Sequence, residues 1–461
     1  MSGPVAMTRF RRLFPVAVSV CLAGAVVGAA RPRYGGTLKL EATDAGAMRH
    51  VNALAYERLV ANDASGVLRP VLATSWDSDQ GGRRWTFKLR HGVKLHDGST
   101  LQPSQIAATL RDAHGDWQIS TEGDAVIIDP GRDMPDLPWQ MADSSNAIAI
   151  RQGAGTAAGS GPFRIDRVDA GLIVLRAHDN YWDSRPFLDA VEVRTTRSPA
   201  DQLTDVETGR ADMVSIGPTD VRRIEQRQLD IESSGPLELM ALAFEPPLAT
   251  SANDGVRRTF AAAIDRAAIA RVVLQGRAEP ANALLPQWVS GYGPFVFEGK
   301  AAPLSRTAVA ALPGARRTLA LRVTPADPVA QAVGQRIAVN ARDAGFAVTV
   351  QAPAGLGPRF DLRLLRLPFR ASGPPQALSD LMSGLGPRTL TLFGRLTRPD
   401  AGASLEDVLV TERALLATDV IVPVVYVPEL YAVGLRVHSW NGPAVLPSGA
   451  WNFANVWLNA P

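Results

Sequence analysis

The sequence predicts an α/β protein built from two lobes, and three observations support that prediction. The chain has 461 residues, more than one hydrophobic core ordinarily organises. Hydrophobic residues make up 46% of it and charged residues 20%, which is the balance of a folded globular protein. A strand–helix–strand pattern covers residues 318–350, and such a βαβ unit needs a sheet that helices cover.

Alternating apolar and polar residues predict most strands of the first half. The expected strands are residues 35–41, 85–90, 163–168, 172–176 and 188–193, of which the third and fourth form a hairpin. Two helices are expected where proline stands at a first helical position, one from Pro103 to about Leu110 and one from Pro199 to Thr208. Residues 114–158 are poorly patterned.

The second half follows helical periods more closely. Asn253 or Asp254 is expected to cap a helix from Val256 to about Leu274, because apolar residues there fall on one face. In the βαβ unit, a helix from Pro325 to Gly345 is expected between strands 318–323 and 346–350. The differing patterns of the two halves are consistent with two lobes.

The N-terminal segment predicts export. Three arginines between Arg9 and Arg12 precede an apolar run, residues 13–30, that ends in small residues. We interpret residues 1–30 as a signal peptide and expect a periplasmic protein. The alternative is an uncleaved membrane anchor, since about 18 apolar residues can just span a bilayer. Cys21, the only cysteine, lies inside this segment, so the remaining chain has no thiol for disulfides or catalysis.

Charge and motif content argue against several classes of protein. Without residues 1–30 the basic and acidic residues balance, so the chain offers no global basic field to nucleic acid. The motifs Gly-x-Ser-x-Gly, Gly-x-x-x-x-Gly-Lys and His-Glu-x-x-His are absent from the sequence, and we expect no enzyme activity and no catalytic residue. Six scattered histidines predict no dedicated metal site and no cofactor, although a chelated metal needs few protein ligands.

A series of short segments stands in an order typical of one known family. They are Tyr56-Glu-Arg-Leu59, Leu72-Ala-Thr-Ser-Trp76, residues 82–98, Gly159-Ser-Gly-Pro-Phe163, Asn180-Tyr-Trp182, Gly209-Arg-Ala-Asp212 and Ala263-Ile-Asp-Arg266. Together they resemble the peptide/nickel-type (family 5) bacterial extracellular solute-binding proteins. The likeness is close over residues 35–285 and looser beyond them.

This resemblance implies a two-lobe periplasmic binding protein fold of the type II-like kind, with a discontinuous first lobe and a reduced extra subdomain. Residues 31–240 would form lobe I, including a subdomain at about 62–157. Residues 241–429 would form lobe II, and residues 430–461 would return to lobe I.

The resemblance also implies a function. The protein would be the monomeric substrate-binding component of an ABC importer, which captures a small peptide or peptide-like solute between its lobes and delivers it to permease subunits. One alternative is a ligand-presenting sensor or chaperone on the same fold. Another is a binder of a non-peptide solute, such as an anionic compound or chelated nickel.

By the same resemblance, three segments reach the cleft between the lobes. The implied ligand-binding residues are Phe244, Glu245, Phe369, Arg370, Ser372 and Tyr426. Glu245 could bind a ligand ammonium or simply face solvent, and Tyr426 could contact ligand or support the hinge. Peptide-binding members have an aspartate in the second segment, whereas this chain has no acid there before Asp380. Arg370 would instead favour an anionic group, unless it is a solvated loop arginine.

Overall fold

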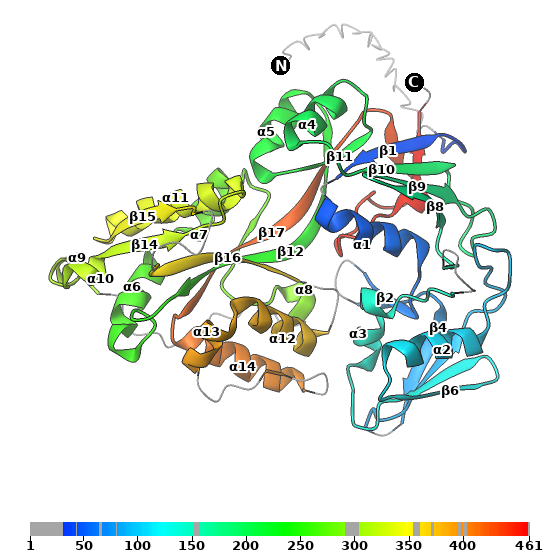
Figure 1. The fold of residues 1–461 in the computed structure, drawn as a ribbon, viewed down its shortest axis with the longest axis horizontal. Helices are drawn as coiled ribbons and strands as arrows, with labels where there is room; N and C mark the ends of the chain where they lie inside the picture. Colours follow the sequence, from blue (N-terminus) through cyan, green and yellow to red (C-terminus); the bar gives the residue numbers. More distant parts are fainter. Residues whose placement is uncertain are drawn as a thin grey trace, which may run out of the picture. The chain divides into compact units, whose positions relative to one another are not determined.

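Two long antiparallel strands, β12 (Asp230–Phe244) and β17 (Ile421–Val433), organise the fold in this computed structural model (Figure 1). Their apolar residues occur in nearly continuous runs, which is typical of strands that are covered on both faces. Residues 239–244 and 421–427 are all buried. The two strands therefore lie inside the molecule and connect its parts.

The structure describes residues 31–42, 44–63, 67–79, 81–151, 157–290, 304–353, 360–369, 373–393, 398–399 and 403–459. The expected signal peptide, residues 1–30, lies outside that set. Residues 33–461 form one compact unit, and the following description concerns this unit. Over the described residues, no helix combines the length and apolar character needed to cross a membrane.

The main sheet has 11 strands and mixes parallel with antiparallel pairs. Its spatial order is β15 (Ala347–Gln351), β14 (Thr318–Arg322), β16 (Leu362–Pro368), β12, β17, β11 (Met213–Ile216), β1 (Thr37–Glu41), β10 (Ala190–Arg194), β9 (Leu172–Ala177) and β8 (Phe163–Asp169), with β13 (Glu279–Pro280) paired to β17. Parallel pairing joins β1 to β10 and β11, and β14 to β15 and β16.

Three smaller sheets lie outside this one. They are β4 (Ala73–Ser78), β5 (Trp85–Leu89), β7 (Ala125–Asp129) and β6 (Gln118–Glu122) in that order, then β2 (Val60–Asn62) with β3 (Leu68–Pro70), and β18 (Val437–Ser439) with β19 (Val456–Leu458).

Helices lie in the connections between the strands. The longer ones are α1 (Asp44–Ala55), α2 (Pro103–Ala113), α4 (Pro199–Glu207), α6 (Asp254–Ala263), α11 (Pro328–Asp343), α12 (Pro374–Leu385) and α14 (Leu405–Ala417). The shorter ones are α3 (Leu137–Met141), α5 (Val221–Gln226), α7 (Arg266–Ala268), α8 (Gln287–Ser290), α9 (Arg306–Ala310), α10 (Gly314–Arg317) and α13 (Pro387–Leu390). Single turns are η1 (Ser144–Asn146), η2 (Pro218–Asp220), η3 (Ser251–Asn253), η4 (Ile269–Val273), η5 (Thr391–Phe393) and η6 (Phe453–Asn455).

The described residues form separate hydrophobic cores. The first core packs β12, β14, β16 and the start of β17 against α6, α11, α12 and α14. The second core packs β1, β8, β9, β10 and the end of β17 against α1 and the C-terminal segment. A third lies between α2 and the sheet of β4, β5 and β7, and a fourth packs α4 and α5 on β11. Two main cores that share β17 agree with two lobes, whereas the exact expected lobe boundaries stay a prediction.

Local side-chain bonds explain several helix starts. Asp327 Oδ1 accepts a hydrogen bond from the Ala330 backbone N at 2.9 Å, and Pro328 then occupies the first position of α11. Ser198 Oγ accepts from Asp201 N at 3.2 Å ahead of Pro199 in α4. These caps satisfy backbone donors that a helix start leaves free.

Most of the expected elements are confirmed, including the βαβ unit, whose strands β14 and β15 pair in parallel. The single helix expected over residues 256–274 is wrong. Ile264 is extended with ψ 112°, and the Asp265 side chain then accepts from Ala268 N at 2.8 Å, so a new helical turn begins there. Residues 114–158 hold β6, β7 and α3, which their weak patterning did not reveal.

The pairing of β12 with β17 is irregular where the strands pass between the two main cores. Pro236 stands opposite Pro428, and the register shifts on both sides of Pro236. Because proline has no backbone N–H, neither residue can donate a hydrogen bond to the other. The crossing is therefore less restrained than the strand segments inside each core.

The segment Gly159-Ser-Gly161 packs its backbone directly on the end of α1. A Cβ atom on Gly159 would lie 2.0 Å from the carbonyl oxygen of Ala55, and one on Gly161 would lie 2.3 Å from that of Leu54. The Gly161 N–H donates to the Ala55 carbonyl at 3.1 Å. Glycine at both positions therefore fixes where α1 ends.

A buried carboxyl group follows α1. Glu57 is 8% exposed, and it accepts hydrogen bonds from the Tyr181 hydroxyl at 3.0 Å and from Trp182 Nε1 at 2.9 Å. The Arg90 guanidinium lies 3.8 Å from the centroid of the Trp182 ring. Burial raises the pKa of Glu57 to about 7, although the hydrogen bonds from Trp182 and Tyr181 oppose the shift. This cluster ties the chain after α1 to residues 181–182.

Gly159→Ala should lower the free energy of unfolding by about 2 kcal/mol or more, because the added methyl group meets backbone that cannot move aside. Gly115→Ala is the matched control, since a Cβ there meets nothing within 4 Å. It should change stability by less than about 1 kcal/mol. Urea unfolding of both variants measures the difference, and equal stabilities would contradict the close approach.

Glu57 should make the protein less stable as pH rises. Its pKa is about 7 in the folded state against an ordinary 4.5, so folding retains a proton that the unfolded chain releases between those values. The free energy of unfolding should therefore decline between about pH 5 and pH 8, and it should decline less in Glu57→Gln. Denaturant unfolding across that range measures both slopes. Superimposable pH profiles would refute the buried acid.

Candidate ligand-binding site

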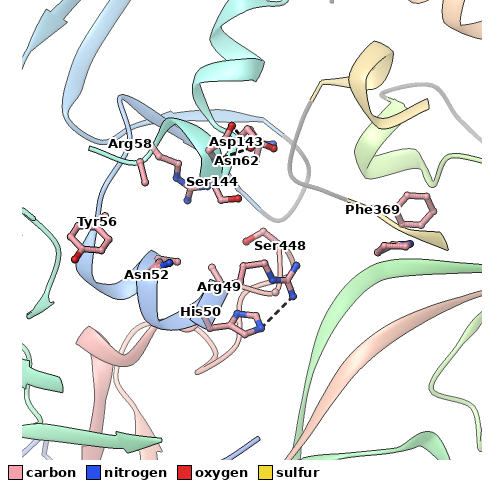
Figure 2. A pocket seen from close by; sticks show the side chains of 16 residues that line it. Arg49, His50, Asn52, Tyr56, Arg58, Asn62, Asp143, Ser144, Phe369 and Ser448 are labelled. Atoms are coloured by element: carbon pink, nitrogen blue, oxygen red, sulfur yellow. Dashed lines mark hydrogen bonds between the residues drawn. The ribbon is translucent and has the colours of Figure 1, made fainter. Parts of the chain in front are cut away.

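A cavity of about 480 Å³ lies between Phe369 of the first core and helix α1, which packs on the second core (Figure 2). Its walls come from α1, the chain after α1, η1, the end of β16 and a loop near the C-terminus. The lining residues are Arg49, His50, Asn52, Ala53, Tyr56, Arg58, Asn62, Asp143, Ser144, Ser145, Ala147, Pro368, Phe369, Ser448, Gly449 and Ala450.

Helix α1 supplies one wall because its two faces differ. Arg49, Asn52 and Ala53 line the cavity, and their spacing of three and four residues places them on one helical face. Val51 and Leu54 lie on the other face, buried in the second core. The helix is thus held by its apolar side and presents polar groups to the cavity.

The opposite wall is apolar and belongs to the first core. Phe369 follows β16 directly, is 2% exposed and lines the cavity. Its backbone N donates to the Leu237 carbonyl at 2.7 Å, and its ring lies 6.0 Å from the ring of Tyr426. These contacts fix Phe369 to both connecting strands.

An ion-pair network joins α1 to Glu429 of β17. Arg49 Nη2 lies 2.5 Å from Glu429 Oε1, and His50 Nε2 lies 3.1 Å from Glu429 Oε2. The Tyr431 hydroxyl donates to the same carboxylate at 3.3 Å, and the His50 ring stacks on Trp451. Burial alone would raise the pKa of Glu429, but His50 and Arg49 outweigh it and hold that pKa below its ordinary value.

A second group of polar side chains lies across the cavity from α1 (Figure 2). Arg58 Nη1 donates to the Ala142 carbonyl at 2.6 Å. Asp143 Oδ1 accepts from Ser145 N at 2.8 Å, which shapes η1. Asn62 Oδ1 is buried without a hydrogen-bond partner in the described part of the chain. This wall thus keeps hydrogen-bonding capacity for a guest.

The cavity combines an apolar wall with polar groups that point inward, which is the usual composition of a small-molecule site. Its charged and amide side chains can bind and orient a solute. Within the described residues, no three or more His, Cys, Asp or Glu side chains gather where they could hold a metal ion.

Two of the residues expected at the ligand do not line this cavity. Phe244 is fully buried in the first core, where its ring packs edge-on against Phe260 at 5.6 Å. Glu245 forms an ion pair with Arg363 rather than facing solvent alone. Neither residue lines the cavity, because β12 ends at Phe244 inside the first core and Glu245 follows it directly.

The other expected residues fall into two groups. Phe369 lines the cavity. Tyr426 lies behind Phe369 with its hydroxyl donating to the carbonyls of Ala283 at 2.7 Å and Leu285 at 3.1 Å, a position that supports the strand. Arg370 and Ser372 lie outside the described residues and stay predictions.

Sequence reasoning missed the contribution of α1 and the C-terminal loop. A helical-period reading of residues 47–56 would have separated the apolar Ala47, Val51 and Leu54 from the polar Arg49 and Asn52. No local signal marks Ser448 or Gly449, because the tertiary fold alone brings that loop to the cavity.

Comparisons with known proteins agree with this architecture. Oligopeptide-binding protein AppA of Bacillus subtilis (strain 168) is 23% identical over 295 residues, which cover 55% of this chain and 54% of that protein. The nickel-binding periplasmic protein of Escherichia coli (strain K12) is 23% identical over 270 residues, 50% of each chain. This chain spans between a third and about half of the length of the curated relatives it matches.

Among solved structures, NikA from Brucella suis in complex with Fe(III)-EDTA superimposes with a TM-score of 0.72 at 18% identity, covering 93% of this chain and 100% of that one. Such a likeness supports the two-lobe α/β fold. Residues 67–123 and 129–377, more than half of the chain, match the family described as bacterial extracellular solute-binding proteins, family 5 Middle. The chain belongs to the family 5 bacterial extracellular solute-binding proteins.

Proposed function

We propose that this protein is the substrate-binding component of an ABC importer and that it captures a small peptide or peptide-like solute in the cavity between its lobes. The observation that carries the proposal is a cavity lined by Phe369 of the first core on one side and by α1, which packs on the second core, on the other. A guest held there contacts both lobes at once, so it favours the conformation in which they approach.

The irregular crossing at Pro236 and Pro428 supports this mechanism. A ligand shifts an open–closed equilibrium only if it binds the closed state more tightly. Contacts from α1 on one side and Phe369 on the other supply that difference. Closure also removes water, which strengthens each remaining polar contact.

The proposed site keeps Phe369 from the sequence-based set and adds the polar residues of α1 and of the wall around Arg58. Tyr426 is a supporting residue in this proposal, and Phe244 and Glu245 are omitted because of their positions. Arg370 and Ser372 remain expected neighbours of the ligand.

Export to the periplasm and delivery to permease subunits complete the proposal. Both rest on the interpretation of residues 1–30 as a signal peptide and on the family to which the chain belongs. The curated relatives include a protein named for oligopeptides and one named for nickel, so peptide and chelated metal are the two ligand classes to compare first.

A native mass spectrum of protein isolated from the periplasm should show the added mass of a bound solute. That solute should be small enough for an ordinary small-molecule pocket, whose volume reaches about 1,000 Å³. Returning the released solute to stripped protein should restore the complex with the solute's mass unchanged. A product of altered mass would instead indicate an enzyme. Saturation near 100 times the Kd should stabilise the protein by about 2.7 kcal/mol.

Filling the cavity should block binding without unfolding the protein. Asn52 is an exposed residue of α1 that lines the cavity, so Asn52→Trp places a large ring inside it. We expect this variant to bind the recovered solute roughly tenfold or more weakly. Met48→Trp on the same helix is the control, because Met48 is exposed and does not line the cavity. Equal binding by both variants would place the site elsewhere.

A further inference from the structure

Two arginines line the cavity, and they differ in how their charges are compensated. Arg49 lies 2.5 Å from a carboxylate oxygen of Glu429, so its charge is already paired. Arg58 makes a single hydrogen bond, to the Ala142 carbonyl, and has no ion-pair partner among the residues that the structure describes. A guanidinium has five N–H donors, so most of those on Arg58 remain available to a guest.

The acids nearest to Arg58 are committed to other contacts. Glu57 turns its carboxyl group to Tyr181 and Trp182. Asp143 Oδ1 accepts from both the backbone N and the hydroxyl of Ser145, at 2.8 Å and 2.7 Å. Burial lowers the pKa of Arg58, and Asp143 and Glu57 oppose that shift, but an arginine stays protonated in proteins.

Asn62 provides a second unfilled group on the same wall. Figure 2 places its side chain beside Asp143 and Ser144, on the wall that also carries Arg58. Its Oδ1 atom is buried and accepts no hydrogen bond from the described residues. A buried acceptor without a donor is unfavourable, so this position favours a guest that brings a donor, such as an N–H.

We propose that Arg58 and Asn62 form a subsite for a carboxylate that has an N–H on the adjacent carbon. The carboxylate would accept two hydrogen bonds from the Arg58 guanidinium, and the neighbouring N–H would donate to Asn62 Oδ1. The C-terminal residue of a peptide and a free α-amino acid share this chemistry. The nearby Asp143 disfavours guests of higher negative charge. The inference rests on the proposed function, because it names which end of the solute this wall receives.

Four probes separate the two features of the guest. Trialanine carries both the carboxylate and the N–H, trialaninamide lacks the carboxylate, and Ala-Ala-lactate replaces the last N–H by an ester oxygen. L-Norleucine presents the same head group without a peptide. Titration calorimetry of each probe against the whole protein gives the Kd values.

The wild-type protein should bind trialanine roughly 10- to 100-fold more tightly than trialaninamide, since a hydrogen-bonded charge is lost in the amide. Arg58→Gln should abolish that discrimination. Arg58→Lys, which keeps the charge but not the fork, should retain part of it. Asn62→Ala should bind trialanine and Ala-Ala-lactate equally, whereas the wild type prefers trialanine by roughly 3- to 10-fold.

Arg69→Gln is the matched control, because Arg69 is exposed, pairs with Asp63 and does not line the cavity. It should preserve both preferences. Thermal unfolding of the variants without probes tests whether each one folds, and Arg58→Lys provides the comparison if Arg58→Gln does not.

Equal binding of trialanine and trialaninamide by the wild type would overturn this subsite and leave the proposed transport function intact. Binding of L-norleucine, lost in Arg58→Gln, together with no binding of any peptide, would support the subsite and overturn the peptide part of the proposed function. If none of the four probes binds, the subsite is overturned, and the recovered native solute then decides the function independently.

Discussion

The structure depends on one constraint: strand β17, which pairs with β12, must contribute residues to two hydrophobic cores at once. The inner segments of both strands are buried in the first core, and the end of β17 is buried in the second. A strand shared in this way keeps both cores in one continuous sheet. It also concentrates any relative motion of the cores at the crossing, where Pro236 and Pro428 face each other without backbone donors.

The cavity follows from that arrangement. Its apolar wall, at Phe369, is the edge of the first core, and its polar wall, at α1, is the edge of the second. The position of α1 is in turn fixed by the glycines of the segment 159–161 and by the buried Glu57 that follows the helix. Residues of the family-like motifs, such as Gly159, Gly161 and Glu57, therefore act mainly by positioning α1. The exposed face of α1 then lines the cavity.

The sequence predicted the fold well because the fold is encoded in repeated local patterns. Period-two strands such as 163–168 and the βαβ unit at 318–350 contain their own periodicity and end signals. The helix expected over residues 256–274 was wrong because its apolar face continues across Ile264, whereas the Asp265 cap that divides it is a single local contact. The hydrophobic pattern of the sequence does not show whether the apolar face or the Asp265 cap determines where the helix ends.

The site was less predictable for a physical reason. Phe369, one of the residues expected at the cleft, lines the cavity because the strand that ends before it leads out of the first core. Phe244 and Glu245 lie at and just after the end of β12. The pairing of β12 with β16 places that end inside the first core, away from the cavity. Arg49, Asp143 and Ser448 come from segments far apart in sequence, so only the tertiary structure brings them together.

The central claim is that two cores close on a guest around the crossing of β12 and β17. Spin labels at Ser120→Cys in β6, beside the third core, and at Ser383→Cys in α12, beside the first core, are both exposed and measure it in a Cys21→Ser background. Double electron–electron resonance should give a shorter interlabel distance when the recovered solute is bound than when it is removed. An interlabel distance that does not change while the solute binds would contradict the account.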